Sequence, residues 1–178
     1  MTCMTSHSTS AGKLAVRQLA ELALICALMV AGKEALRVIP NVHPITLLIL
    51  LCVRIYGVRA LYPTFGFVLL EIGLYGAGIW NIMYLYTWPL LVLVALPFRK
   101  SDNRLFWAAL AGIHGFLFGA LCAIPYFFIG GLPMAISWWV SGIPYDIIHG
   151  VSNMVMTFVL LPPLYALMLQ RGGQTNSQ

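Results

Sequence analysis

The chain has 178 residues, of which 61% are hydrophobic and only 8% are charged, and its formal net charge is +5. Soluble domains carry roughly a quarter charged residues, so this composition excludes a water-soluble protein and indicates an integral membrane protein. The positive charge includes no basic run of the type that binds nucleic acid, so we expect no nucleic-acid partner. The four cysteines form neither a CxxC pair nor a metal-binding spacing.

Charge clusters and Gly/Pro turns divide the sequence into six apolar segments between polar tails at residues 1–13 and 171–178. The predicted spans of this single membrane domain, residues 14–170, are Leu14–Gly32, Pro44–Tyr56, Ala60–Tyr75, Ile82–Phe98, Leu105–Ile129 and Gly142–Leu169. The second segment is short for a full crossing, so it must begin earlier, near Asn41, or lie where the bilayer is locally thin. The sequence therefore predicts an all-α membrane protein with six transmembrane helices.

The basic residues separate to the two sides of this six-span arrangement. Only Lys33 and Arg37 fall on one side. The other side collects Lys13, Arg17, Arg54, Arg59, Arg99, Lys100, Arg104 and Arg171. Because Lys and Arg accumulate in cytoplasmic loops, both termini are predicted to be cytoplasmic in a cell membrane.

Three connections on the outer side are rich in Gly, Pro, Asn and Trp, and are predicted to be loops. They are Lys33–His43, Gly76–Asn81 and Gly130–Ser141. The tryptophans expected near this outer boundary are Trp80, Trp88, Trp138 and Trp139. Such a set is typical of an interfacial belt, but it also fits a ring of stacking surfaces around a ligand.

Polar side chains recur along the last predicted span, in the stretch SGIPYDIIHGVSN. Asp146, His149 and Asn153 stand at i, i+3 and i+7, which places them on one helix face in the outer half of the bilayer. Glu71 lies at a similar depth on the third span. Ionisable groups at this depth are costly and by default mark a pathway or a cavity. The alternative is helix contact, with Asp146 bonded to a neighbouring helix and His149 to a backbone carbonyl.

Metal binding and catalysis are further explanations for these side chains. A metal site would draw on Asp146, His149, Glu71 and His43, but no single-helix signature such as HExxH is present. A hydrolase would need a nucleophile with a base, and there is no GxSxG motif and no obvious serine partner for His114 or His149. We therefore expect no catalytic residue, no metal and no resident cofactor, and interpret the polar face as pocket wall and helix contact together.

Small residues predict a close helix contact on the fifth span. His114 lies among Gly112, Gly115 and Gly119, and glycines let another helix approach closely.

Small residues also form a stripe on the first span. Ala23, Ala27 and Ala31 recur at i, i+4 spacing, which predicts either a docking face for another membrane protein or a packing face within this chain. Near the start of the same span, Arg17 and Glu21 are spaced to form an ion pair.

The chain resembles the substrate-binding S components of energy-coupling factor (ECF) vitamin transporters over essentially all six spans. The resemblance rests on the AxxxAxxxA face of the first span and on the stretches IPNVHPITLLI, FVLLEIGLYGAGIWNIMYLYTWPLL and WWVSGIPYDIIHGVSNMVM. It implies a non-enzymatic subunit that docks through Ala23, Ala27 and Ala31 onto a coupling transmembrane subunit. It also implies that two partner ATPases hydrolyse ATP, that the ligand binds in the outer half, and that the subunit topples in the bilayer to deliver it.

The ligand expected from this resemblance is cobalamin. The neutral, aromatic outer loops and the stretch GALCAIPYFFIGG look most like the cobalamin-specific group. Pantothenate, folate or a queuosine precursor are alternative ligands, and a small intramembrane metal-dependent enzyme is an alternative class. The predicted substrate-binding residues are Asn41, His43, Glu71, Tyr75, Trp80, Asn81, Tyr84, Tyr126, Trp138, Tyr145, Asp146, His149 and Asn153.

Overall fold

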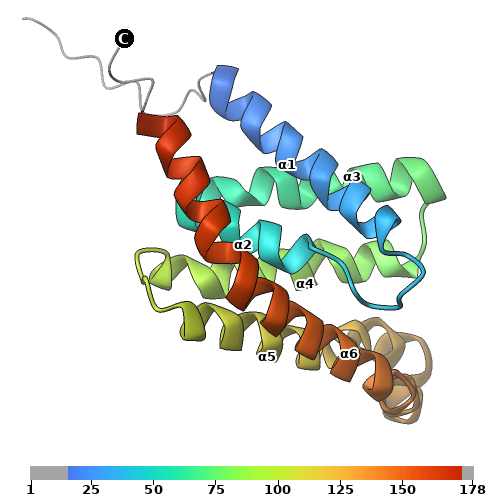
Figure 1. Ribbon diagram of the computed structural model, residues 1–178. Coiled ribbons are helices and arrows are strands. Elements are labelled where there is room, and N and C mark those ends of the chain that lie inside the picture. Colours follow the sequence, from blue (N-terminus) through green and yellow to red (C-terminus); the bar gives the residue numbers. More distant parts are fainter. Residues whose placement is uncertain (1–15, 174–178) are drawn as a thin grey trace, which may run out of the picture.

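The computed structural model describes the backbone of residues 16–173 and the side chains of residues 16–170, and this part of the chain is helical, without a strand (Figure 1). The predicted all-α fold is therefore confirmed. The α-helices are α1 (Val16–Ala35), α2 (Ile45–Tyr56), α3 (Leu61–Tyr75), α4 (Ile79–Ala95), α5 (Arg104–Cys122) and α6 (Ile124–Gly173). Short 3-10 turns, η1 (Gly57–Ala60) and η2 (Leu96–Phe98), follow α2 and α4.

Helix α2 forms the centre of the bundle. All nine residues of 45–53 are buried, as expected for a helix that is apolar on every side. It begins at Ile45 after Pro44, in agreement with the predicted bounds Pro44–Tyr56, and the alternative of an earlier start near Asn41 is wrong. Asn41 has a left-handed backbone, with φ 58°, and belongs to the connection from α1. The twelve residues of α2 continue through η1 into α3 as one apolar stretch, Ile45–Tyr75.

Four stretches of the described chain are long and apolar enough to cross a membrane. They are Ile45–Tyr75, Ile79–Phe98, Arg104–Cys122 and Ile124–Gln170. This finding agrees with a membrane protein. The count of six spans and the orientation of the termini remain predictions.

The predicted outer loop Gly130–Ser141 is wrong. The chain there is helical except at Gly130 and Gly131, where it reverses direction. Gly131 has φ 72°, a conformation that a residue without a Cβ adopts at little cost. Pro133 stands in the first turn after the reversal, where its missing N–H costs little, so this proline does not interrupt a helix. The single element α6 thus contains two antiparallel segments.

The predicted tails lie mostly outside the described residues. The first, residues 1–13, lies outside entirely, and so do residues 174–178 of the second. Helix α6 continues to Gly173, so it includes the first three residues of the predicted C-terminal tail.

The two ends of the bundle, which can be followed in Figure 1, differ in the charged residues of their sequence. One end, called here the basic end, holds the α2–α3 and α4–α5 connections, the start of α1 and the end of α6. Its described basic residues are Arg17, Arg54, Arg59, Arg99, Lys100 and Arg104. The opposite end, called here the neutral end, has only two basic residues, Lys33 and Arg37, which Glu34 and Glu71 balance, and Asp146 is a further acidic residue there.

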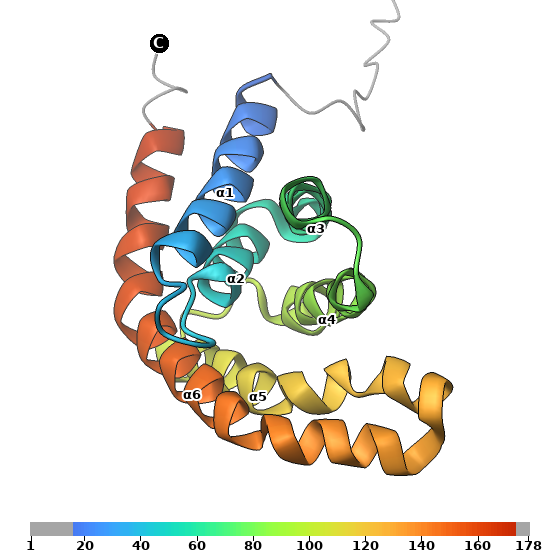
Figure 2. The same ribbon diagram turned by 90° about the vertical axis from the view of Figure 1, so that its right-hand side faces the viewer.

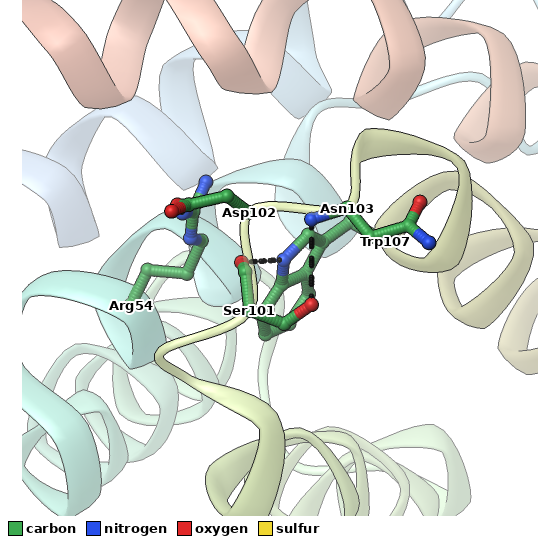
Figure 3. A network of polar contacts seen from close by, with 5 residues as sticks. All are labelled: Arg54, Ser101, Asp102, Asn103 and Trp107. Carbon is green, nitrogen blue, oxygen red and sulfur yellow. Dashed lines mark hydrogen bonds and ion pairs between the residues drawn. The ribbon is translucent and has the colours of Figure 1, made fainter.

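The α4–α5 connection at the basic end is held by polar contacts (Figure 3). Trp107 Nε1 donates to the carbonyl oxygen of Ser101 at 2.8 Å. Arg54 lies 2.7 Å from Asp102. Asn103 caps α5 by accepting a hydrogen bond from the Phe106 N–H at 3.0 Å. These contacts set the position from which α5 runs to the neutral end.

Helices α5 and α6 pack closely through glycines. A Cβ at Gly115 would lie 2.6 Å from the Cα of Gly150, so the two backbones touch. Gly112 and Gly119 face α6 in the same way, at Met154 and Asp146. The helix contact predicted around His114 is therefore confirmed. The face of α6 that turns inward is lined by Asp146, His149, Gly150, Asn153, Thr157 and Leu161, all of them buried.

Candidate functional site

An aromatic cavity of about 330 Å³ opens at the neutral end, between α4, α5, α6 and the α1–α2 connection. Its walls are mainly apolar and aromatic, with a few polar groups, which is the usual character of a small-molecule site. The lining residues are Asn41, Trp80, Met83, Tyr84, Phe118, Gly119, Cys122, Trp138, Ser141, Gly142, Tyr145 and Asp146.

A second, charged cavity of about 490 Å³ lies beside the first, between the ends of α1 and α3 and the start of α4. Trp80 and Tyr84 line both cavities, so these two rings stand between them. The complete lining of the charged cavity is Lys33, Glu34, Arg37, Glu71, Tyr75, Trp80 and Tyr84.

Asp146 joins α6 to α5 at the edge of the aromatic cavity. Its Oδ1 accepts a hydrogen bond from the backbone N–H of Gly119 at 2.9 Å. Its Oδ2 is buried and has no hydrogen-bond partner in the described structure. The predicted bond to a neighbouring helix is therefore confirmed, and a second acceptor oxygen is left for another donor.

His149 fastens the α1–α2 connection to α6. Its Nδ1 lies 3.0 Å from the carbonyl oxygen of Asn41, so this nitrogen carries the proton and donates. Ser152 Oγ approaches the same oxygen at 3.4 Å. The predicted bond from His149 to a backbone carbonyl is therefore confirmed. Because Asn41 also lines the aromatic cavity, this contact positions part of the cavity wall.

A buried aromatic cluster surrounds Trp88 beneath the aromatic cavity. The indole ring centroid lies 5.1 Å from that of Phe118, 5.4 Å from that of His114 and 5.9 Å from that of His43. Trp88 is 1% exposed, so it is not part of an interfacial belt. The face of α4 that carries it turns toward the centre of the bundle.

His43 lies in the α1–α2 connection, with its ring centroid 4.8 Å from that of His149. Burial, with smaller contributions from the neighbouring His149 and Lys33, lowers the pKa of His43 from 6.5 to about 3. The imidazole is therefore neutral at physiological pH. No three or more His, Cys, Asp or Glu side chains of the described chain gather in an arrangement that could hold a metal ion.

A partly buried ion pair crosses the charged cavity. Lys33, in the last turn of α1, pairs with Glu71 on α3, whose side chain is 1% exposed. The same ammonium lies 5.0 Å from the centroid of the Tyr75 ring, within the range of a cation–π contact. Glu71 Oε1 has no hydrogen-bond partner in the described structure. This pair ties α1 to α3 at the neutral end.

The structure divides the predicted substrate-binding residues into groups. Six of them line the aromatic cavity: Asn41, Trp80, Tyr84, Trp138, Tyr145 and Asp146. The charged cavity adds Glu71 and Tyr75. Behind the cavities, and lining neither, lie His43, His149 and Asn153.

Two of the predicted residues have local roles. Asn81 Oδ1 accepts a hydrogen bond from the Gly78 N–H at 2.7 Å and so caps α4. Tyr126 stacks on Trp138, with ring centroids 4.0 Å apart. Neither Asn81 nor Tyr126 lines a cavity.

Sequence reasoning missed several lining residues. Phe118, Gly119 and Cys122 are on one face of α5, opposite Asp146, and their helical spacing was a usable signal. Lys33 and Arg37 also line the charged cavity, whereas the sequence indicates only that they are charges of an outer connection. The others are Glu34, Met83, Ser141 and Gly142.

The alanine stripe of α1 faces away from the bundle. Ala23, Ala27 and Ala31 are exposed, whereas the opposite face packs inward. The residues buried on that inner face are Leu22, Ile25, Cys26 and Met29. Packing within this chain, one of the two predicted explanations for the stripe, is therefore wrong. The predicted Arg17–Glu21 ion pair on the same helix is confirmed at 2.8 Å.

The fold and the two cavities define the class: an all-helical protein with helices of membrane-spanning character and a ligand-sized space at one end. Comparisons with protein-family models, with characterised proteins and with solved structures give no match. A more specific function must therefore be argued from the residues of this chain.

Proposed function

We propose that this protein is the substrate-binding S component of an ECF-type importer, which captures a vitamin at the neutral end of the bundle. The observation that carries the proposal is the aromatic cavity, because six of the thirteen residues predicted from sequence converge on it from α4, α6 and the α1–α2 connection. The neutral end is the outer side in this proposal, and the basic end is cytoplasmic, in accord with the distribution of Lys and Arg.

The polar groups of the aromatic cavity suit a ligand that carries hydrogen-bond donors. Asp146 Oδ2 is a buried acceptor without a partner, and a buried polar group gains stability when a ligand supplies one. Trp80 and Trp138 are aromatic rings of the cavity wall, and Tyr126 stacks on Trp138 from outside the wall. A flat ring with N–H or amide groups would satisfy both features.

Cobalamin is the ligand that the sequence resemblance favours. Cavities of about 330 and 490 Å³ are within the range that drug-sized molecules occupy, and a corrin with its side chains exceeds either one alone. Cobalamin binding would therefore require movement of Trp80 and Tyr84, the rings shared by the two cavities. Pantothenate or another small nutrient would need no such movement.

The exposed alanine stripe supports docking of this protein onto a partner subunit in the membrane. Small side chains let the backbone of another membrane helix approach closely, and nothing in the described chain covers Ala23, Ala27 and Ala31. In this proposal the stripe docks onto a coupling transmembrane subunit, and two partner ATPases supply the energy. The protein itself is then a binding subunit and not an enzyme.

Ligand titration of the purified protein in lipid nanodiscs tests the binding function. Cobalamin is tested first by its visible absorption, followed by a calorimetric panel of other vitamins. Trp80→Ala should weaken binding at least tenfold, because this ring lines both cavities. Trp139→Ala is the matched control: Trp139 is as exposed as Trp80, at 42% against 41%, but lines neither cavity. If no vitamin of the panel binds, the proposal is wrong.

Asp146→Asn separates binding from chemistry. The asparagine oxygen can still accept from Gly119, so the variant should fold and lose only about 1–3 kcal/mol of ligand affinity. An enzyme that used Asp146 as an acid or base would instead lose its turnover by orders of magnitude while still binding its substrate. That outcome would favour the alternative class.

Docking is tested by co-purification with the coupling subunit. Ala27→Trp should abolish the complex and leave ligand affinity unchanged, because Ala27 lines neither cavity. Val159→Trp, at an exposed apolar position of α6, is the matched control.

A further inference from the structure

The two antiparallel segments around Gly130 and Gly131 form a projection, called here the hairpin arm, which consists of residues 124–140. Helix α5 ends at Cys122, a turn at Ala123 follows, and the arm leaves the bundle there. Figure 2 shows the arm extending sideways, while α3 is seen nearly along its axis. In Figure 1 the arm lies at the end of the bundle that holds the α1–α2 and α3–α4 connections. The arm therefore runs across the bundle axis at the neutral end.

The surface of the hairpin arm is apolar and exposed. No Asp, Glu, Lys or Arg occurs from Leu105 to Tyr145, so the arm carries no charged side chain. Phe128 is 80% exposed, Ile129 61% and Leu132 59%. The other large exposed side chains of the arm are Ile124, Phe127, Met134, Ile136, Trp138, Trp139 and Val140. A projection of this composition would be unfavourable in water, because its apolar area would remain hydrated.

The arm is held by contacts of its own. Tyr126 on the outgoing segment stacks on Trp138 of the returning segment, with an interplanar angle of 23°. Where the arm joins the bundle, Asp146 accepts the hydrogen bond from Gly119. The arm is thus a defined pair of helical segments attached at its base to the wall of the aromatic cavity.

We propose that the hairpin arm lies in the headgroup region of the bilayer at the neutral end, as an interfacial anchor that contacts neutral lipids. Spanning helices stand close to the bilayer normal, so an element that crosses them at one end of the bundle runs near the membrane plane. Its exposed apolar side chains continue the exposed faces of α5 and α6, at Phe116, Leu117 and Ile147, which face lipid if the bundle spans the membrane. Trp and Tyr are the side chains enriched at the headgroup level.

Contact with neutral lipid accounts for two features of the arm, its lack of charge and its contribution to the aromatic cavity. The absence of charge removes the electrostatic attraction that anionic lipids or a charged protein surface would need, whereas zwitterionic lipids bind through apolar area alone. The arm also supplies Trp138 to the aromatic cavity, so an anchored arm places that cavity at the membrane surface. This inference rests on insertion of the bundle in a bilayer and does not depend on the identity of the ligand.

Collision rates of a nitroxide label measure the depth of the arm. Phe128→Cys is labelled in a variant whose four cysteines are replaced by alanine, and reconstituted in phosphatidylcholine nanodiscs. Val38→Cys in the α1–α2 connection is the matched control, because Val38 is also apolar, 84% exposed and at the neutral end. The ratio of collisions with oxygen to collisions with a water-soluble nickel chelate should be several-fold higher at position 128 than at position 38.

Each other result overturns the proposal. Equal nickel accessibility at positions 128 and 38 would place the arm in water. Shielding of position 128 from both oxygen and nickel would place the arm against protein, such as a second copy of this chain.

If the cysteine-free variant does not fold, quenching of the native tryptophans by brominated phosphatidylcholine gives the depth. Bromines near the headgroup should then quench more of the fluorescence in the native protein than in Trp139→Phe, and equal quenching would contradict the anchor.

Discussion

Asp146 and Gly119 form a contact that depends on the absence of a side chain at position 119. The carboxylate accepts the Gly119 N–H at 2.9 Å, and a Cβ at that position would lie 2.2 Å from Oδ2. This contact joins α6 to α5 where the hairpin arm meets the bundle, and both residues line the aromatic cavity. The packing of two helices and the shape of the cavity thus depend on the same pair.

Gly119→Ala should lower the free energy of unfolding by about 1–3 kcal/mol, because Asp146 must move or the helices must separate. Denaturant titration in detergent, followed by circular dichroism, measures the change. Gly73→Ala is the matched control, since no atom lies within 4 Å of a Cβ at that helical position. Alanine is favoured over glycine in a helix by about 1 kcal/mol, so the control should be neutral or stabilising. A Gly119→Ala protein as stable as the native one would contradict the close contact.

Gly115→Ala should be more destabilising than Gly112→Ala. A Cβ at position 115 would meet the backbone of Gly150 and His149 at 2.6–2.9 Å, and backbone atoms cannot rotate away. A Cβ at position 112 would meet the Met154 Cβ at 3.3 Å and the Gly150 carbonyl oxygen at 3.5 Å, so a shift of a few tenths of an ångström makes room for it. The same titration ranks the two variants. Equal losses would mean that α5 and α6 are not in backbone contact at Gly115.

The face of α6 was predictable because helical periodicity is a local property. The spacing of Asp146, His149 and Asn153 requires one shared face on any helix, and the structure buries that face. The atoms to which Asp146 and His149 form hydrogen bonds could not be predicted from the sequence. The Gly119 N–H and the Asn41 carbonyl come from segments 27 and 108 residues away, so tertiary packing decides them.

The hairpin arm and Trp88 show where local signals mislead. Gly and Pro in residues 130–141 favour a loop, but the two segments of the arm stack against each other and remain helical. Residue type alone favours a place for Trp88 in an interfacial belt, but its side chain is buried in the bundle. The division into two cavities depends on the placement of Trp80 and Tyr84, which no pattern in the sequence predicts.

Acid should destabilise the folded protein through His43. The unfolded chain takes up a proton below its ordinary pKa of 6.5, whereas the folded protein does so only near a pKa of about 3. The stability contributed by the neutral imidazole is therefore complete above pH 6.5 and is lost as the pH falls toward 3. The slope from this single group is at most about 1.4 kcal/mol per pH unit. Denaturant titrations between pH 7.5 and 4.5 measure it.

His43→Gln provides the comparison for this pH dependence. Glutamine is polar but does not titrate, so the variant should lose stability less steeply on acidification than the native protein. Parallel pH profiles for the two proteins would show that His43 is not the group responsible.

Arg54→Lys should cost more stability than Asp102→Asn. The Arg54 side chain is only 6% exposed and its guanidinium lies 3.7 Å from the centroid of the Tyr165 ring, a contact that a lysine cannot reproduce as a planar stack. The loss expected from this contact is about 0.5–2 kcal/mol. Asp102 is 90% exposed, so removing its charge should cost less than about 1 kcal/mol. The reverse order would mean that the ion pair, and not the ring contact, holds Arg54.

Lys33→Met should be far more destabilising than Glu71→Gln, because the two partners differ in their access to water. Loss of Lys33 leaves the Glu71 carboxylate buried without a counter-charge, and breaking a buried ion pair in this way costs about 3–5 kcal/mol. Loss of the Glu71 charge leaves an ammonium that is 26% exposed and can turn toward solvent. The double variant Lys33→Met/Glu71→Gln removes both charges, so it should recover a large part of the stability that Lys33→Met loses. Denaturant titration of the four proteins gives the coupling free energy. If the losses of the two single variants simply add in the double variant, the pair does not tie α1 to α3 energetically.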